Sequence, residues 1–163
     1  MQIGVVSDTH NNLKNIDKII SLFNKENIDF VIHTGDVTNA NALEKFSRLK
    51  CQLIGVYGNN DRNEKGLKDV ALKYDFLFQE PPNSINLFKR NIAIFHEPDS
   101  IDEFLLNNDD IDIILHGHTH RYRHEVKNNT LFFNPGESAG MLAGSNAIGI
   151  LDLTTLKARR IFF

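Results

Sequence analysis

The chain has 163 residues, of which 41% are hydrophobic and 24% charged, with a formal net charge of −3. These values are ordinary for a globular protein and predict a single domain over residues 1–163. The weak negative charge gives no broad attraction to nucleic acid or anionic lipid, and no apolar run approaches the roughly 20 residues that cross a membrane.

The N-terminal segment MQIGVVSDTH lacks the positive region and the long apolar region of a signal peptide. The single cysteine, Cys51, cannot form an intramolecular disulfide, which is typical of a reducing compartment. Because Cys51 opens the apolar run CQLIGVY, we interpret it as a structural thiol. These features predict a cytoplasmic protein.

The first half of the chain alternates strand-like and helix-like patterns. Short apolar runs predict strands at residues 2–7, 28–34 and 51–57. Between them, apolar residues recur at helical spacing over positions 13–23 and again over positions 42–49. This order predicts parallel strands joined by right-handed helical crossovers.

The pattern changes after a helix predicted near residues 64–73. A second helix is expected at 99–107, and strands at 84–88, 91–96, 111–116, 121–126, 130–133, 147–152 and 157–163. The short polar turns between these runs indicate more antiparallel pairing. The whole chain is therefore predicted to be an α/β protein with two packed sheets and helices outside.

Metal-ligand residue types follow five of the apolar runs. They are Asp8 and His10, Asp36, the Asn59–Asn60–Asp61 segment, His96, and the pair His118 and His120. Ligands of open α/β sheets bind beyond the carboxyl ends of the strands. In extended backbone, residues two apart share a face, so we expect Asp8 to pair with His10 and His118 with His120. Three glycines are expected to let the backbone turn tightly beside an ion, namely Gly35, Gly58 and Gly117.

The candidate ligands are too many for one ion, but with one bridging carboxylate they divide evenly between two. Two divalent cations against the carboxylates of Asp8 and Asp36 leave a charge of about +2, which suits a hydroxide and a phosphate oxygen. Mixed imidazole and carboxylate ligands favour transition metals over calcium or magnesium. We therefore expect two divalent ions, with manganese first and nickel, iron, cobalt and zinc as alternatives.

Each candidate also has a simpler explanation. Asp8 and Asp36 could cap helices, the segment 59–61 could be a plain turn, and His96 could be an ordinary hydrogen-bonded histidine. The agreement of five segments favours the metal site. The other histidines are placed outside it: His33 is expected to pack or bond locally and His124 to face solvent, while His116 either packs or orients a ligand from behind.

The order of these motifs resembles the calcineurin-like metallophosphoesterases, and the spacing is similar to that of the small, cap-less YfcE-type phosphodiesterases. The matching elements are D-x-H at 8–10, G-D at 35–36, G-N-x-D at 58–61, His96 and G-H-x-H at 117–120, and the likeness extends to a turn at 134–136. The family fold is two mixed β-sheets in a four-layer αββα sandwich. The resemblance assigns one metal to Asp8, His10, Asp36 and His120, and the other to Asp36 as a bridge with Asn59, His96 and His118.

The resemblance implies a phosphoric ester hydrolase, specifically a phosphodiesterase whose metal-bridging hydroxide attacks phosphorus. A small-molecule phosphate ester is the expected partner. Nucleic acid is not, because only 22 positions separate His96 from His118 and leave no room for a large cap. Homo-oligomerisation stays open. The alternatives are a phosphomonoesterase or nucleotidase on the same site, or a non-catalytic scaffold like the retromer subunit of this fold.

Two positions depart from the family pattern. Asn60 stands where the family commonly has a histidine that serves the leaving group or the phosphate, so Asn60 is the candidate catalytic residue. An amide cannot donate a proton as an acid, and we expect slow turnover of poor leaving groups. Glu97 follows His96 where the family often has glycine, and its role is open.

Overall fold

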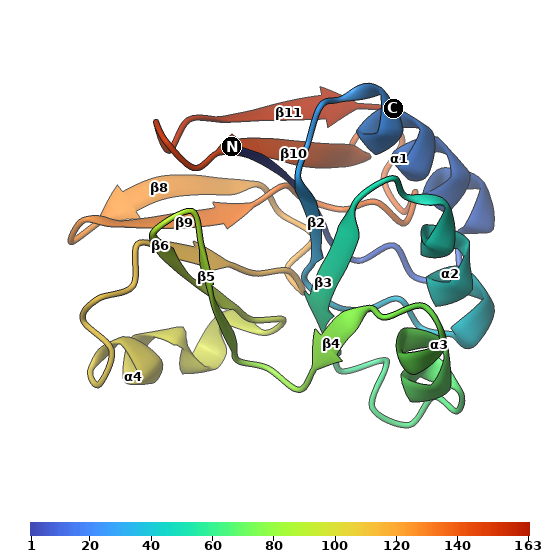
Figure 1. Ribbon diagram of the computed structural model, residues 1–163, viewed down its shortest axis with the longest axis horizontal. Helices are drawn as coiled ribbons and strands as arrows, with labels where there is room; N and C mark the ends of the chain where they lie inside the picture. Colours follow the sequence, from blue (N-terminus) through green and yellow to red (C-terminus); the bar gives the residue numbers. More distant parts are fainter.

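Two mixed β-sheets pack face to face in the computed structural model, which describes residues 1–163 (Figure 1). Across the first sheet the strands are β11 (Ala158–Phe162), β10 (Ala147–Asp152), β1 (Gln2–Val6), β2 (Phe30–His33), β3 (Gln52–Val56) and β4 (Leu77–Gln79). Strands β1 to β4 are parallel, whereas β10 and β11 pair antiparallel.

The second sheet is also mixed. Its strands, in order, are β5 (Asn83–Leu87), β6 (Arg90–Ile94), β7 (Ile113–Leu115), β9 (Thr130–Asn134) and β8 (Arg123–Lys127). The central strands β6, β7 and β9 are parallel, and the edge strands β5 and β8 pair antiparallel. The expected parallel first half and more antiparallel second half are therefore confirmed.

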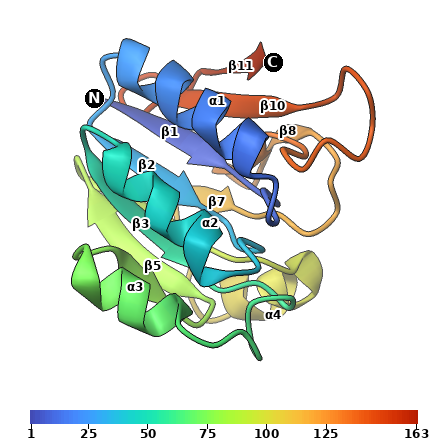
Figure 2. The same ribbon diagram turned by 90° about the vertical axis from the view of Figure 1, so that its right-hand side faces the viewer.

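Helices cover both outer faces. Helices α1 (Leu13–Lys25), α2 (Ala40–Lys45) and α3 (Leu67–Lys73) lie on the first sheet, and α4 (Ile101–Leu105) lies on the second (Figures 1 and 2). Three separate apolar clusters fill the three interfaces between these four layers. The predicted α/β sandwich with helices outside is confirmed. None of the helices has the length and apolar character needed to span a membrane.

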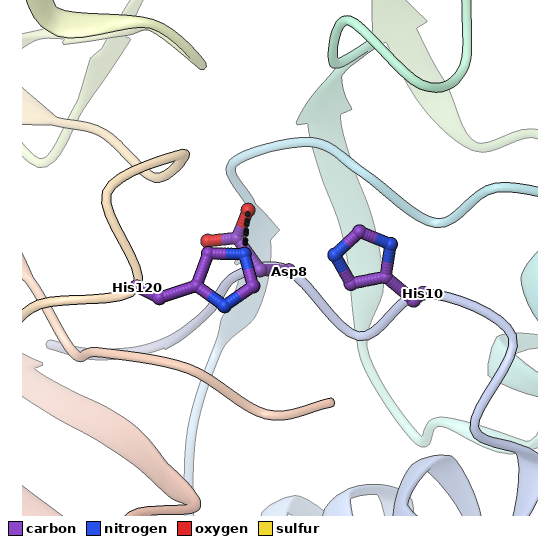
Figure 3. Close-up of side chains that lie close together, drawn as sticks. All are labelled: Asp8, His10 and His120. Carbon is purple, nitrogen blue, oxygen red and sulfur yellow. Dashed lines mark ion pairs between the residues drawn. The ribbon is translucent and has the colours of Figure 1, made fainter. Parts of the chain in front are cut away.

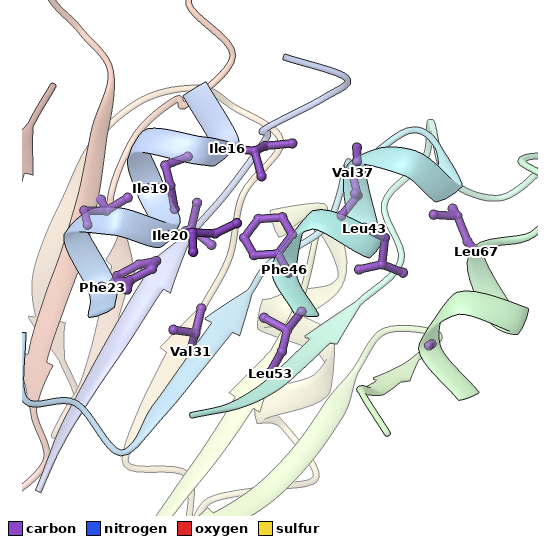
Figure 4. Packing of buried hydrophobic residues seen from close by; sticks show 14 of the residues in the cluster. Ile16, Ile19, Ile20, Phe23, Val31, Val37, Leu43, Phe46, Leu53 and Leu67 are labelled. Carbon is purple, nitrogen blue, oxygen red and sulfur yellow. The ribbon is translucent and has the colours of Figure 1, made fainter. Parts of the chain in front are cut away.

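Helix α1 shows how the apolar spacing becomes packing. Ile16, Ile19, Ile20 and Phe23 recur along one face, are each at most 4% exposed, and belong to the apolar cluster between the helices and the first sheet (Figure 4). The Asn12 side chain caps the helix by accepting the backbone N–H of Asn15. Burying four such side chains contributes roughly 1.5–3 kcal/mol each relative to exposure, so tertiary packing stabilises this helix.

The boundaries differ from the predictions in identifiable ways. Strand β4 (Leu77–Gln79) was not predicted, because a three-residue edge strand is too short to show a period. The helix expected near 64–73 begins at Leu67, since Gly66 has φ 84° and caps it in the left-handed conformation. The helix expected at 99–107 is a 3₁₀ turn, Pro98–Ser100, followed by the short α4.

Hydrogen bonds between loops bring the carboxyl ends of both sheets to one edge of the sandwich. The backbone N–H of Gly117, after β7, donates to the His96 carbonyl, after β6. The His96 ring in turn donates to the carbonyl of Thr34, after β2, and the N–H of His118 donates to the carboxylate of Asp8, after β1. The loops that carry the predicted ligands are thereby tied together.

Candidate metal centre

All seven predicted ligands lie in loops just beyond strand ends, at this one edge. Asp8 and His10 follow β1, Asp36 follows β2, Asn59 follows β3, His96 follows β6, and His118 and His120 follow β7. We call Asp8, His10 and His120 the first half-site, and Asn59, His96 and His118 the second half-site. Asp36 lies between the two.

The backbone of these loops is strained. Five of the seven residues have positive φ, with Asp8 at 51°, His10 at 45°, Asp36 at 61°, His118 at 65° and His120 at 55°. Outside glycine this conformation costs roughly 1–3 kcal/mol per residue and concentrates at functional sites. The expectation that extended backbone pairs these side chains is wrong, because the chain turns at each position and aims each side chain separately.

The three glycines serve two different purposes. Gly35 has φ 101°, as a tight turn requires. Gly58 and Gly117 do not have positive φ, so the expected tight turn does not explain them. A Cβ on Gly58 would overlap the Asp36 carboxylate, and a Cβ on Gly117 would overlap the Ser7 hydroxyl. These two glycines let the backbone approach the site closely.

In the first half-site, the imidazoles of His10 and His120 lie near the Asp8 carboxylate, and Figure 3 marks the contact between Asp8 and His120. His120 Nε2 is 3.6 Å from Asp8 Oδ1, and His10 Nε2 is 4.0 Å from Asp36 Oδ2. His10 Nε2 is buried and has no hydrogen-bond partner in the protein. A buried polar atom without a partner is costly, and a cation between these groups would satisfy it.

In the second half-site, the ligand atoms contact one another. Asn59 Oδ1 accepts hydrogen bonds from His96 Nε2 at 2.9 Å and from His118 Nδ1 at 3.0 Å. His96 Nδ1 also donates to the Thr34 carbonyl at 2.9 Å, and His96 Nε2 lies 3.5 Å from Asp36 Oδ1. Both His96 nitrogens therefore face oxygen acceptors. A proton on each nitrogen, or a cation in place of the Nε2 proton, satisfies this arrangement.

The two buried carboxylates have pKa values shifted in opposite directions. Burial raises the pKa of Asp8, although the Ser7 hydroxyl donates to it. Burial would also raise the pKa of Asp36, but the contact with His96 and the donors of Asn60 outweigh burial and lower it. Asp36 is therefore held as an anion between the half-sites, where it would attract cations from both sides.

Asn60 contacts the same carboxylate. Its backbone N–H donates to Asp36 Oδ1 at 2.9 Å, and its side-chain Nδ2 donates to Asp36 Oδ2 at 2.7 Å. The residue at the expected catalytic position thus places an N–H donor, and no acid, beside the cluster. Glu97 lies farther out, in an ion pair with Arg62 at 2.7 Å that is partly exposed.

Two residues that were not among the seven predicted ligands hold the cluster in place. Asp61 is 3% exposed and accepts the backbone N–H groups of Asp36, Thr38 and Gly58 at 2.7–2.8 Å, which locks the loops after β2 and β3 together. Its place in G-N-x-D was the available signal. The second is Glu137, which is 1% exposed and whose Oε2 lies 3.7 Å from His120 Nδ1. No sequence pattern pointed to it.

The remaining histidines lie outside the cluster. The backbone N–H of Gly35 donates to His33 Nδ1, which is local bonding as expected. His33 Nε2 therefore carries the proton and donates to the hydroxyl of Thr9, on another loop. Burial lowers the pKa of His33 to about 3 and that of His116 to about 4. His116 Nε2 faces Arg123, away from the ligands. The predicted exposure of His124 is confirmed.

This donor set fits divalent cations. It combines imidazoles, two buried carboxylates and an amide oxygen, which are ligands that transition metals accept. It also contains a buried imidazole nitrogen without a partner. The αββα sandwich and this cluster at the carboxyl ends of its strands define the class of protein. It is an α/β protein with a candidate metal-binding site at one edge of its sheets.

The chain belongs to the calcineurin-like phosphoesterase superfamily, whose domain matches residues 1–156. A curated relative, phosphodiesterase MJ0936 of Methanocaldococcus jannaschii, is 37% identical over 99% of this chain and 98% of its own length. Phosphodiesterase YfcE of Escherichia coli is 26% identical over 93% of this chain and 88% of its own length. The resemblance seen in the motifs is confirmed, and so is the enzyme class of the family, phosphoric ester hydrolases.

Solved structures agree on the fold. The structure of an archaeal phosphodiesterase matches with a TM-score of 0.91 at 34% identity, covering 100% of both chains. Wild-type Vps29 of Entamoeba histolytica, complexed with zinc, matches with a TM-score of 0.70 at 17% identity, covering 99% of both chains. At that identity the second likeness shows the fold alone.

Proposed function

We propose that this chain is a metal-dependent phosphodiesterase that hydrolyses small phosphate esters at a dinuclear centre. The observation that carries the proposal is the convergence of seven ligand-type side chains, from five strand ends, around the carboxylates of Asp8 and Asp36. The relatives named as phosphodiesterases support the choice of reaction.

In this proposal each half-site holds one divalent ion, with manganese expected first. Asp36 reaches both, because its two oxygens lie 4.0 Å from His10 Nε2 and 3.5 Å from His96 Nε2. When bound, the ions would supply Lewis acidity toward phosphoryl oxygens and lower the pKa of a water. Asp61 and Asn60 keep Asp36 in place through the hydrogen bonds of the loops after β2 and β3.

Asn60 gives the proposed reaction a particular limit. Its side-chain amide can donate a hydrogen bond to a phosphate oxygen, but it cannot supply a proton to the leaving group. Esters whose leaving oxygen needs protonation should therefore react slowly. Activated aryl esters, whose leaving groups are stable as anions, should react faster.

The direct test measures hydrolysis of a bis-aryl phosphate with added Mn²⁺ or Ni²⁺. We expect turnover that requires the metal and disappears with a chelator. A mono-aryl phosphate measured in parallel separates a phosphodiesterase from a phosphomonoesterase or nucleotidase. Faster hydrolysis of the mono-aryl ester would replace the proposed activity with the alternative.

A non-catalytic scaffold of the same fold is the second candidate. Against it, all seven ligand positions in this chain hold ligand-type residues. Stoichiometric metal binding with no hydrolysis of any ester in a panel of diesters, cyclic nucleotides and nucleotides would favour the scaffold.

A further inference from the structure

Glu137 is a buried carboxylate that the proposed reaction does not use. It follows the Asn134–Pro135–Gly136 turn and is 1% exposed. Burying an ionisable carboxylate is costly unless hydrogen bonds or a charge partner compensate. The groups that contact the Glu137 carboxylate therefore indicate its role.

The two oxygens of Glu137 face two different parts of the molecule. Oε1 accepts the backbone N–H of Leu142 at 2.7 Å, and Oε2 accepts the backbone N–H of Met141 at 3.1 Å. Oε2 also lies 3.7 Å from Nδ1 of His120. One carboxylate therefore contacts both a loop and a predicted metal ligand.

The geometry around His120 places a carboxylate at each end of the imidazole. Nε2 is 3.6 Å from Asp8 Oδ1, on the side of the first half-site, and Nδ1 faces Glu137 on the opposite side. A carboxylate behind a ligating histidine holds the proton on the far nitrogen, which leaves the near nitrogen free to bind a cation. Glu137 is placed to do this for Nε2.

The loop held by Glu137 is residues 138–146, the part of the β9–β10 connection that leads into β10, and it extends to the right in Figure 2. Asn12 Nδ2 donates to the Ala139 carbonyl at 2.7 Å, and Asn15 Nδ2 donates to the Ser138 carbonyl at 2.9 Å. These amides hold the beginning of the loop beside the residues that follow His10. The side chains of Met141 and Leu142 are exposed, so the tip of the loop depends on its bonds to Glu137.

We propose that Glu137 is a positioning residue: it orients His120 toward a cation in the first half-site and couples metal binding to the order of the 138–146 loop. The inference rests on the proposed metal site. Because the same carboxylate serves both partners, the coupling is reciprocal: a bound cation that fixes His120 also fixes the loop, and an ordered loop favours the cation.

The first experiment uses the unmodified protein, with Zn²⁺ as a diamagnetic probe. Long-range ¹H–¹⁵N NMR of the histidine rings should place the His120 proton on Nδ1 when Zn²⁺ is bound. Hydrogen exchange of the Met141 and Leu142 amides should slow when Zn²⁺ is added. A proton on Nε2, or exchange at both amides that saturating Zn²⁺ leaves unchanged, would overturn the inference.

The second experiment compares Glu137→Ala, Glu137→Gln and Asn15→Ala by calorimetric titration with Mn²⁺. Losing a carboxylate behind a ligand typically weakens metal affinity by roughly 10–100-fold, and we expect this for Glu137→Ala. Glu137→Gln should recover part of the loss, because its amide oxygen can still face the proton on Nδ1. Asn15→Ala is the matched control, since it removes the bonds of Asn15 to the loop and leaves the carboxylate in place.

Asn15→Ala should speed amide exchange in the loop and, through the reciprocal coupling, weaken Mn²⁺ binding by less than Glu137→Ala does, because Glu137 still faces His120 in this variant. Equal Mn²⁺ affinity in Glu137→Ala and the unmodified protein would reduce Glu137 to a support for the loop and overturn the inference. If the unmodified protein itself binds no divalent ion, the proposed function fails instead, so the two failures are distinguishable.

Discussion

The two half-sites of the candidate metal centre differ in how the protein satisfies their polar atoms. In the first, the buried Nε2 of His10 has no partner. In the second, Asn59 Oδ1 accepts hydrogen bonds from both His96 and His118, and His96 donates to a main-chain carbonyl as well. The first half-site therefore contains a buried nitrogen without a hydrogen bond, whereas in the second half-site the imidazole protons are already hydrogen-bonded to oxygen atoms of the protein.

This difference has a thermodynamic consequence. A cation in the first half-site relieves an unpaired buried nitrogen, so binding there removes a cost to the folded state. A cation in the second half-site must displace protons from imidazole nitrogens, so binding there depends on pH. We therefore expect the two halves to respond differently to mutation and to pH.

The largest effect is expected from the residue that both halves share. Asp36→Ala should abolish metal loading and hydrolysis together, because it removes the anion between His10 and His96. Metal content by mass spectrometry and bis-aryl phosphate turnover measure the two effects. Asp109→Ala, which removes an exposed carboxylate, is the matched control and should behave like the unmodified protein. An Asp36→Ala protein with full activity would contradict the dinuclear scheme.

The next largest effect is expected on the hydrolysis rate when Asn60, which donates to Asp36, is replaced. Asn60→His should raise the rate on a poor leaving group at least tenfold, since general acid catalysis typically contributes about 10²–10⁴-fold. The rate on an activated aryl ester should change much less, because that leaving group needs no proton. Comparing the two esters is the measurement. An unchanged rate on the poor leaving group would mean that proton supply does not limit this site.

A pair of ligand substitutions tests the contrast between the halves directly. In metal-stripped protein, Asn59→Ala should lower the free energy of unfolding by about 1–3 kcal/mol, because it removes the acceptor shared by His96 and His118. His10→Gln should cost less, since His10 Nε2 has no hydrogen bond to lose. Urea denaturation of both variants provides the comparison. A larger loss for His10→Gln would reverse our interpretation of the half-sites.

The smallest effect is a pH dependence of stability in metal-stripped protein. Burial alone would lower the pKa of His96, but the Asp36 carboxylate outweighs burial and raises it. The folded state therefore binds this proton more tightly than the unfolded chain, whose histidine pKa is about 6.5. The stabilisation is complete below that pH and is lost as the pH rises through the raised folded-state pKa.

Urea denaturation across that range should thus show stability falling as pH rises, with a smaller slope in His96→Gln. His33 contributes with the opposite sign: its pKa is lowered to about 3, so its contribution is lost as pH falls below about 6.5. An unmodified protein whose stability rises with pH through the same window would show that His96 does not control it.

Much of the fold was predictable because its signals are local. The apolar spacing of α1 and the β-rich runs of β1 to β3 lie within single segments, and the structure places these elements where they were predicted. Strand β4 was missed because three residues carry no period. The candidate ligands could be selected because each follows an apolar run, although extended backbone, the reason given for their pairing, was wrong.

The sequence by itself determined the types of ligand and their order along the chain, since both are properties of short segments. Only the tertiary structure decided which atoms are satisfied. Whether His10 Nε2 has a partner, or which carboxylate stands behind His120, depends on contacts between loops of different strands. The bond from His118 to Asp8 spans 110 positions. Such contacts affect stability because a polar atom that is buried without a hydrogen bond destabilises the folded state. Its partner can lie on any segment that the fold places beside it.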